Sequence, residues 1–360
     1  MKKILLGTTA LVAATAVTAG AAQAGETSFD ISGNNTFAIG VGDLDHNATS
    51  GDRADIYENG EIHFNASTTT DSGLSVAWQV QMETEQSNGN FVDENFFTIS
   101  DDWGSVIIGQ ENMPNNKMQY NGGLYVGNFG LSTHGFSQWT GTPAVTEFSG
   151  AFMNSNGIYG ASDLDHIAYY TPRMSGVQVG VGWAPDNAAN DGNGENSARE
   201  DTVSVGINYV ADHGDVGVAV SGGYISHEGG TAVGNGDTNM WHVGTNISTG
   251  GLTFGLSYAD ATDDNNALGT GDGWTLAAGV NYATGPHTVG ISFTTSEVEE
   301  TTTNTADTEG RHILLGYDYA LGGGVDVDAH LLLRDIEGED AGNGDDQDGW
   351  VFVTGINVGF

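Results

Sequence analysis

Apolar and polar residues alternate over many short stretches of this 360-residue chain. In residues 74–83 every second side chain is apolar, and the side chains between them are polar or small. The same period of two recurs in residues 203–209, 252–258, 274–282, 289–293 and 325–333. This period is typical of β-strands with one apolar and one polar face. In a soluble sandwich the apolar faces would form a dry core, whereas in a membrane barrel they would face lipid and the polar faces would line water.

The lengths of the connections decide between these two architectures. Short connections lie at residues 70–72, 101–104, 172–176, 211–214, 249–251, 283–285 and 321–324. Long polar connections lie between them, at residues 42–53, 86–90, 111–162, 185–199, 228–236, 261–271, 298–308 and 337–347. A strict alternation of short and long connections is typical of an up-and-down barrel. The sequence therefore predicts an all-β, transmembrane, antiparallel barrel of sixteen strands, an even number that closes without an edge.

Residues 1–24 have the composition of an export leader. Two lysines precede an apolar run from Ile4 to about Val17, and a small-x-small site at Ala22 to Ala24 would leave Gly25 as the mature start. The alternative is a membrane-spanning helix, but the run is short and no stop-transfer flank follows it. We expect a cleaved signal peptide at 1–24 and one barrel domain at 25–360.

Charge and cysteine content exclude several classes of function. The chain has 47 acidic and 8 basic residues, and two of the bases lie in the leader. Such a surface repels nucleic acid and attracts cations, so no nucleic-acid partner is expected. There is no cysteine, which excludes disulfides, thiol catalysis and cysteine–metal sites.

Residues 111–162 are the longest stretch without a strand pattern. They carry many aromatic residues and methionines, which argues against disorder and for packing against something else. Alternating segments flank them, at residues 96–110 on one side and 165–183 on the other. We therefore predict that residues 111–162 form a long third loop that folds into the lumen of the barrel and constricts it.

Aromatic residues near the strand ends support a barrel in a membrane. They share the apolar parity, on which an amphipathic ring would lie at the level of the lipid head groups. They are Trp78, Trp183, Trp241, Trp274, Trp350, Tyr209, Tyr258, Tyr282, Tyr317 and Tyr319.

Several of these features together resemble one family. The leader, residues 94–110, the long third loop, residues 165–176 and the terminal Phe360 are similar to the general porins of Gram-negative bacteria, especially the alphaproteobacterial kind. The resemblance implies a homotrimer in the outer membrane, in contact with its lipid, without catalysis or a cofactor. It implies passive diffusion of small hydrophilic solutes and ions through a water-filled pore, and recognition of Phe360 by the barrel-assembly machinery.

The sequence departs from the family pattern in two places. These porins set acids of the third loop against a cluster of arginines on the opposite wall. Here the inward parity of the second and third strands carries Glu61, His63, Asn65, Gln79, Gln81 and Glu83, so the basic half is largely missing. The second loop, which latches onto a neighbouring subunit in many relatives, has only about five residues, 86–90.

Charged residues near the narrowest point set the selectivity of a pore. Loop candidates are Glu111, Lys117 and Glu147, with Asp163 and Asp165 where the chain re-enters the wall. Wall candidates are His63, Gln79, Gln81, Glu83 and Arg334, with Asp318, Asp326, Asp328 and His330. The alternative for each acid is a solvated loop or rim charge. The sign of the charge predicts weak cation selectivity.

Runs of acids in the loops would supply oxygen ligands for a structural Ca²⁺. The candidates are Asp263, Asp264, Asp345, Asp346 and Asp348, and their spacing matches neither an EF-hand nor a calcium β-roll. The alternative is acidic loops that are simply solvated.

Two other classes of function compete with a channel. One is an outer-membrane barrel hydrolase, but the sequence has no Gly-x-Ser-x-Gly, His-Glu-x-x-His or phosphate-loop motif. The other is a secreted acidic β-rich adhesin, which would form no channel. We therefore expect a channel and no enzyme.

Overall fold

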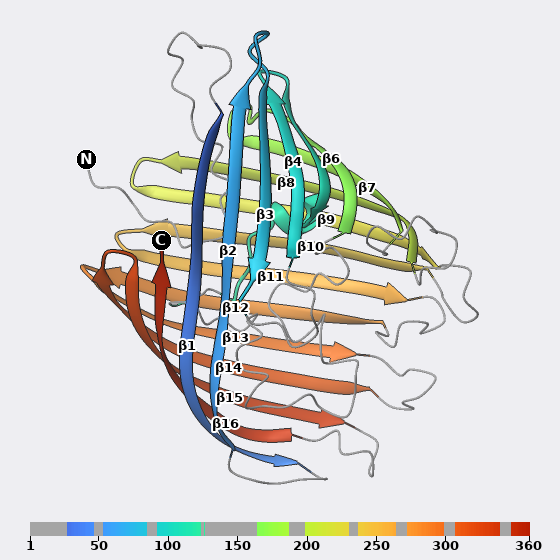
Figure 1. The fold of residues 1–360 in the computed structure, drawn as a ribbon. Helices are drawn as coiled ribbons and strands as arrows, with labels where there is room; N and C mark the ends of the chain where they lie inside the picture. Colours follow the sequence, from blue (N-terminus) through green and yellow to red (C-terminus); the bar gives the residue numbers. More distant parts are fainter. Residues whose placement is uncertain are drawn as a thin grey trace.

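The computed structural model describes residues 27–46, 53–84, 92–123, 126, 164–186, 199–229, 237–263, 272–298, 307–338 and 347–360. The predicted leader lies outside these residues, as does most of the third loop. Sixteen antiparallel strands pair with their neighbours in chain order and close into a barrel where β1 meets β16 (Figure 1). The strands are β1 (Ser28–His46), β2 (Arg53–Thr69), β3 (Ser75–Glu83), β4 (Val92–Asp101), β5 (Gly104–Glu111), β6 (Leu164–Tyr170), β7 (Val177–Asp186), β8 (Arg199–His213), β9 (Val216–Gly229), β10 (Thr238–Thr249), β11 (Leu252–Asp263), β12 (Gly273–Thr284), β13 (His287–Val298), β14 (Thr308–Gly322), β15 (Val325–Gly338) and β16 (Gln347–Gly359).

The connections alternate between short and long around the whole barrel, which confirms the predicted topology. The ends of some strands differ from the prediction. β1 continues to His46, although a loop was expected from Gly42, because residues 42–46 remain paired with residues 347–351 of β16. Within the described part of the chain, no helix is long and apolar enough to cross a membrane.

The apolar faces of the strands point away from the lumen. In β8, Val203 is 45% exposed, whereas the next residue, Ser204, is fully buried. The same contrast separates Leu256 from Ser257 in β11. The barrel therefore has its polar face inside and its apolar face outside, as predicted, and does not enclose a dry apolar core.

One patch of the inner wall departs from this pattern. A buried apolar cluster lies on β1, β14, β15 and β16, formed by Ala38, Leu44, Leu314, Leu332, Val351 and Val353. The alternation did not predict it, because residues of both parities are apolar in these stretches.

Exposed aromatic rings on the outer wall bond to polar groups of the adjacent strand. Trp78 donates from Nε1 to Asn95 Oδ1 at 2.8 Å. Trp183 donates in the same way to Asp201 Oδ1 at 3.1 Å. These bonds fix the polar edge of each ring, as expected of amphipathic rings at an interface.

The carboxyl terminus completes the closure of the barrel. The backbone of Phe360 exchanges two hydrogen bonds with Gly33 of β1, each 3.0 Å long. The Phe360 side chain is 69% exposed on the outer surface. Its main chain thus closes the last pair of strands, while its ring remains accessible.

Candidate pore constriction

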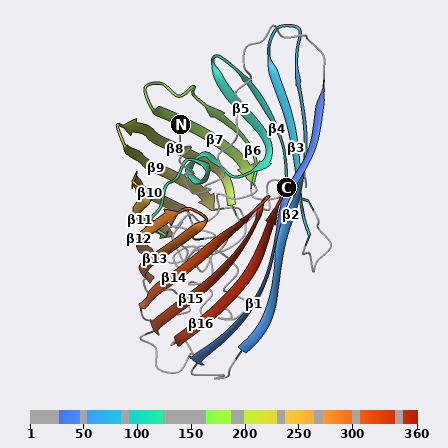
Figure 2. The ribbon, with the colours of Figure 1, turned by 90° about the vertical axis from the view of Figure 1, so that its left-hand side faces the viewer.

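The third loop starts at the end of β5 and turns into the barrel. Residues 114–117 form one short helix, α1 (Pro114–Lys117), which the sequence did not predict. Pro114 suits the first helical position because that residue's N–H has no partner within a helix. Figure 2 shows α1 inside the ring of strands, where it packs against β7, β8 and β9. The described part of the loop, residues 112–123 and 126, thus follows the predicted inward path.

Inward-facing side chains hold the backbone of this segment, which we call the loop arm (residues 112–123). The Asn115 and Tyr120 amides donate to Ser204 Oγ and Ser221 Oγ at 2.9 and 2.8 Å. The Gly122 amide donates to Ser257 Oγ at 2.8 Å. Further bonds come from three donors on the wall to loop carbonyls: Asn208 to Met118, Asn246 to Asn121 and His242 to Asn115. The polar face of the wall therefore satisfies the backbone of a segment that has little secondary structure of its own.

Apolar contacts anchor the same segment. Met113 is fully buried, and Met118 packs in a cluster with Phe96, Ile107, Ala168 and Tyr170. Burial raises the pKa of the Tyr120 phenol above its ordinary value. The loop arm is thus bound to the wall by both polar and apolar groups.

The only cation of the loop arm is neutralised by an acid at the end of β5. Lys117 forms an ion pair with Glu111; the Glu111 side chain is buried, at 4% exposure, and that of Lys117 is partly buried, at 15%. The ammonium group also lies 5.5 Å from the centre of the Phe96 ring. The two predicted loop residues are therefore brought together, but as a pair without net charge.

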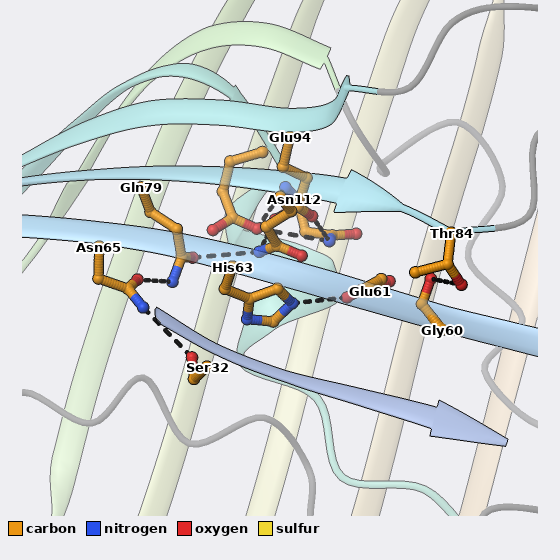
Figure 3. A network of polar contacts seen from close by, with 11 residues as sticks. Ser32, Gly60, Glu61, His63, Asn65, Gln79, Thr84, Glu94 and Asn112 are labelled. Carbon is orange, nitrogen blue, oxygen red and sulfur yellow. Dashed lines mark hydrogen bonds and ion pairs between the residues drawn. The ribbon is translucent and has the colours of Figure 1, made fainter. Parts of the chain in front are cut away.

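Gln79 and Gln81, two of the predicted wall residues, belong to a connected hydrogen-bond network that reaches the loop arm (Figure 3). Asn65 donates to Ser32, Gln79 donates to Asn65, and Gln81 donates to Gln79. Gln81 also donates to Glu94 of β4, which accepts a second bond from Asn112 at 2.8 Å. A chain of amides thus runs from β1 across the wall to the loop, with the buried Glu94 carboxylate as its junction.

Glu94, Asn112 and Asn115 were not among the predicted site residues. Asn95 and Phe97 face outward, and Glu94 lies an odd number of positions from each, so it faces the lumen. This alternation could have identified Glu94 from the sequence. His63 bonds to Glu61 at 2.8 Å on the same wall, and Glu83 lies opposite Glu61 in the register.

A second acidic group lies on the inner face of β14 and β15. Asp318 is the cross-strand partner of Asp328, and Asp326 lies two residues before Asp328. The side-chain nitrogen of Asn357 in β16 donates to both Asp326 and Asp328, at 2.6 and 2.8 Å. The oxygen of the same side chain accepts a bond from Thr36. These acids therefore line the inner wall as a hydrogen-bonded group.

The remaining predicted residues are more scattered. Arg334 is buried on the inner parity of β15, and His330 lies 3.5 Å from Asp328. Asp165 shares the face of Ile167 and Tyr169, both exposed on the outer wall, so the structure does not bring it to the loop arm. Glu147 and Asp163 lie outside the described residues.

The calcium candidates are not brought together. Asp263 ends β11, Asp348 lies on the outer parity of β16, and Asp264, Asp345 and Asp346 lie outside the described residues. Among the residues that the structure does describe, no three acidic or histidine side chains form a metal-ligand set. Calcium binding stays a prediction.

Comparison with known families decides what this barrel is. The family model for Gram-negative porins matches residues 7–355. The chain belongs to the Gram-negative porin family. This porin is therefore an outer-membrane channel for passive diffusion, and its family points to a channel without enzymatic activity.

Solved structures agree on the fold. The porin resembles an anion-selective porin from Comamonas acidovorans, with 18% identity, a TM-score of 0.64, and coverage of 93% of this chain and 100% of that one. It resembles OmpF of Salmonella typhi in complex with daunomycin, with 16% identity, a TM-score of 0.65, and coverage of 92% and 97%. A loop L8 deletion mutant of the Vibrio cholerae outer-membrane protein OmpT has 16% identity, a TM-score of 0.63, and coverage of 93% and 99%. No curated protein sequence matches the chain.

Proposed function

We propose that this porin passes small hydrophilic solutes with a weak preference for cations. The support is the imbalance of charge on the described lumen wall. Of the two bases described in the lumen, Lys117 of the loop arm is paired with Glu111, and Arg334 of the wall is buried, at 6% exposure. The acids Glu61, Glu83, Asp318 and Asp326 are partly exposed on the same inner wall, whereas Glu94 and Asp328 are buried like Arg334. A permeating cation therefore passes more acidic than basic side chains, and its net interaction with the wall is attractive.

The fold alone does not set the sign of the selectivity. The Comamonas acidovorans porin has a similar barrel and is anion-selective. The difference must therefore come from the charged side chains of the wall and the loops, and the charge balance of this chain, with 47 acids, favours cations.

Reversal potentials test this proposal. The purified protein is inserted into planar bilayers with a KCl gradient, and the potential at zero current is measured. We expect the sign that corresponds to K⁺ carrying more current than Cl⁻. The opposite sign would refute cation selectivity, and a potential of zero would show that the wall charges do not act on the permeating ions.

We also propose that the porin assembles as a homotrimer. The support is the short wall formed by β3 to β7: β5 has 8 residues and β6 has 7, whereas β8 to β16 have 12–15. A strand needs about 9–11 residues to cross the hydrocarbon core. β5 and β6 do not reach this length, so a neighbouring subunit would shield them from lipid. One structure of the Vibrio cholerae protein OmpT is a trimer form.

The mass of the detergent-solubilised protein tests the trimer. Light scattering during size exclusion, corrected for bound detergent, should give three times the mass of the chain. A monomeric mass in mild detergent would contradict the trimer and would leave the channel itself in place. Because the second loop is short, we expect the contacts to come from the strands of the short wall and not from a loop latch.

A further inference from the structure

Inward-facing glycines recur on almost every strand from β7 to β14. They often lie opposite one another in the register: Gly180 with Gly206, Gly206 with Gly223, Gly255 with Gly279, and Gly290 with Gly316. In the sequence, several of them begin the pattern Gly–apolar–polar–aromatic, as in residues 206–209, 255–258, 279–282 and 290–293. In this pattern the glycine and the polar residue face the lumen, and the other two residues face outward.

The backbone of the third loop lies directly on these glycines. A Cβ atom on Gly206 would overlap the carbonyl oxygen of Pro114, and one on Gly244 would overlap that of Tyr120. A Cβ atom on Gly279 would lie 2.6 Å from the carbonyl oxygen of Gly122. Such distances do not occur between a real Cβ and a backbone oxygen, so the loop can occupy its place only because these wall positions have no side chain.

The contact is equally close from the loop side and extends past the loop arm. A Cβ atom on Gly122 would overlap the carbonyl oxygen of Ala277. Val126 lies on the next two strands, where a Cβ on Gly290 or Gly316 would be 2.5 or 2.7 Å from its side chain. Glycines thus lie directly against the third loop on β8, β10, β12, β13 and β14. On β9 a Cβ atom on Gly223 would first meet the ring of His242 and then lie 3.0 Å from Asn115 Cβ.

We propose that Gly206, Gly244, Gly279, Gly290 and Gly316, which we call the glycine lane, set the cross-section of the pore. A carbon atom in normal contact lies roughly 3.5–4.0 Å from its neighbour. Any side chain on the glycine lane therefore pushes the third loop away from the wall, and inside a closed barrel that direction is toward the lumen. The glycines are positioning residues that widen the channel by keeping the loop against the wall. The proposal rests on the channel function of the porin family.

Glycines could instead be present only to let the sheet bend. Gly222 separates the two explanations, because it is the neighbour of Gly223 on β9 but faces outward. A Cβ atom on Gly222 would have its nearest contact at 3.6 Å, an ordinary distance. Gly222 lies on the same strand as Gly223 and at nearly the same place in the sheet, but the loop does not pack against it.

The test compares Gly244→Ala and Gly122→Ala with Gly222→Ala in planar bilayers and in liposomes. For the first two variants we expect a loss of single-channel conductance, and a larger loss of uptake for disaccharides than for pentoses. Gly222→Ala should conduct like the unmodified protein. Gly122→Ala lies outside the sheet, so it serves as the test even where Gly244→Ala lowers the yield of folded barrels.

Two results would overturn the proposal. One is that Gly122→Ala forms barrels whose conductance and uptake by solute size equal those of the unmodified protein. The other is that Gly222→Ala loses as much conductance as Gly244→Ala, which would make strand bending the explanation. In both cases the channel would still conduct, so these outcomes are distinct from a failure of the channel function itself.

Discussion

Glu111 and Lys117 form an ion pair that joins the end of β5 to the end of α1, within the lumen. The two residues are six positions apart in the sequence, and between them the chain leaves β5 and turns into α1. Because the Glu111 carboxylate is buried, its charge depends on the Lys117 ammonium for stabilisation. The pair therefore fixes where the third loop departs from the barrel, and adds no net charge to the pore.

Lys117→Met should destabilise the protein more than the double variant Glu111→Gln/Lys117→Met. Removal of one partner leaves a buried carboxylate unpaired, which typically costs about 3–5 kcal/mol, whereas replacement of both charges is often close to neutral. Thermal unfolding in detergent, followed by the loss of β-sheet circular dichroism, measures the difference. Equal stability of the single and the double variant would mean that the Glu111 carboxylate is not destabilised by the loss of its partner.

Asn115 and Ser204 should form a disulfide when both are replaced by cysteine. Ser204 Oγ accepts a bond from the Asn115 amide at 2.9 Å and donates to its side-chain oxygen at 2.6 Å. The chain has no cysteine of its own, so the introduced thiols have no competitors. In Asn115→Cys/Ser204→Cys we expect the disulfide to form under oxidising conditions and to leave the conductance unchanged, because the loop already lies at this position.

The matched control for this cross-link is Asn115→Cys/Val205→Cys. Val205 is the next residue on β8 and has the outer parity, so no disulfide within the folded barrel is expected. A large change in conductance on oxidation of Asn115→Cys/Ser204→Cys would show that the loop normally lies elsewhere.

Asp326→Asn should reduce the cation preference, whereas Asp260→Asn should leave it unchanged. Both substitutions remove one negative charge and keep a side chain that can form hydrogen bonds. Asp326 lies on the inner wall and bonds to Asn357, whereas Asp260 lies on the outer parity and bonds to Tyr258. Reversal potentials of the two variants in the same KCl gradient make the comparison. Equal shifts would mean that the selectivity reflects overall charge and not the lumen wall.

Phe360→Ala and deletion of Phe360 should separate two roles of this residue. One is the closure of the barrel by its main chain, and the other is the recognition of its ring by the assembly machinery. The alanine variant keeps both backbone bonds to Gly33, whereas the deletion removes them. We propose that the assembly machinery recognises the exposed ring, so the alanine variant should refold in detergent with nearly normal stability but reach the outer membrane in lower amounts. Normal amounts of the alanine variant in the membrane would limit the role of Phe360 to its main chain.

The barrel could be predicted from the sequence because two independent patterns agree. The period of two assigns each side chain to a face, and the alternation of connection lengths fixes the strand count. The errors lie at strand ends, as at residues 42–46, where pairing with β16 continues through Gly42 and Asp43 despite their polar, loop-like composition.

The position of the third loop against the barrel wall could not be predicted from the charged residues alone. Glu111 and Lys117 were identified separately, but their pairing depends on the turn into α1. The glycine lane was missed because glycine counts as neither apolar nor polar in an alternation. Its recurrence before an apolar, a polar and an aromatic residue is the signal that could have revealed it. The group formed by Asp326, Asp328 and Asn357 needed the register of β15 and β16.

The central claim is a water-filled passage through the barrel, and single-channel recording tests it most directly. Purified protein added to planar bilayers should produce discrete conductance steps, and above low salt the size of the steps should rise in proportion to the conductivity of the bathing KCl solution. Folded barrels that insert into the bilayer and produce no steps at any salt concentration would contradict the account.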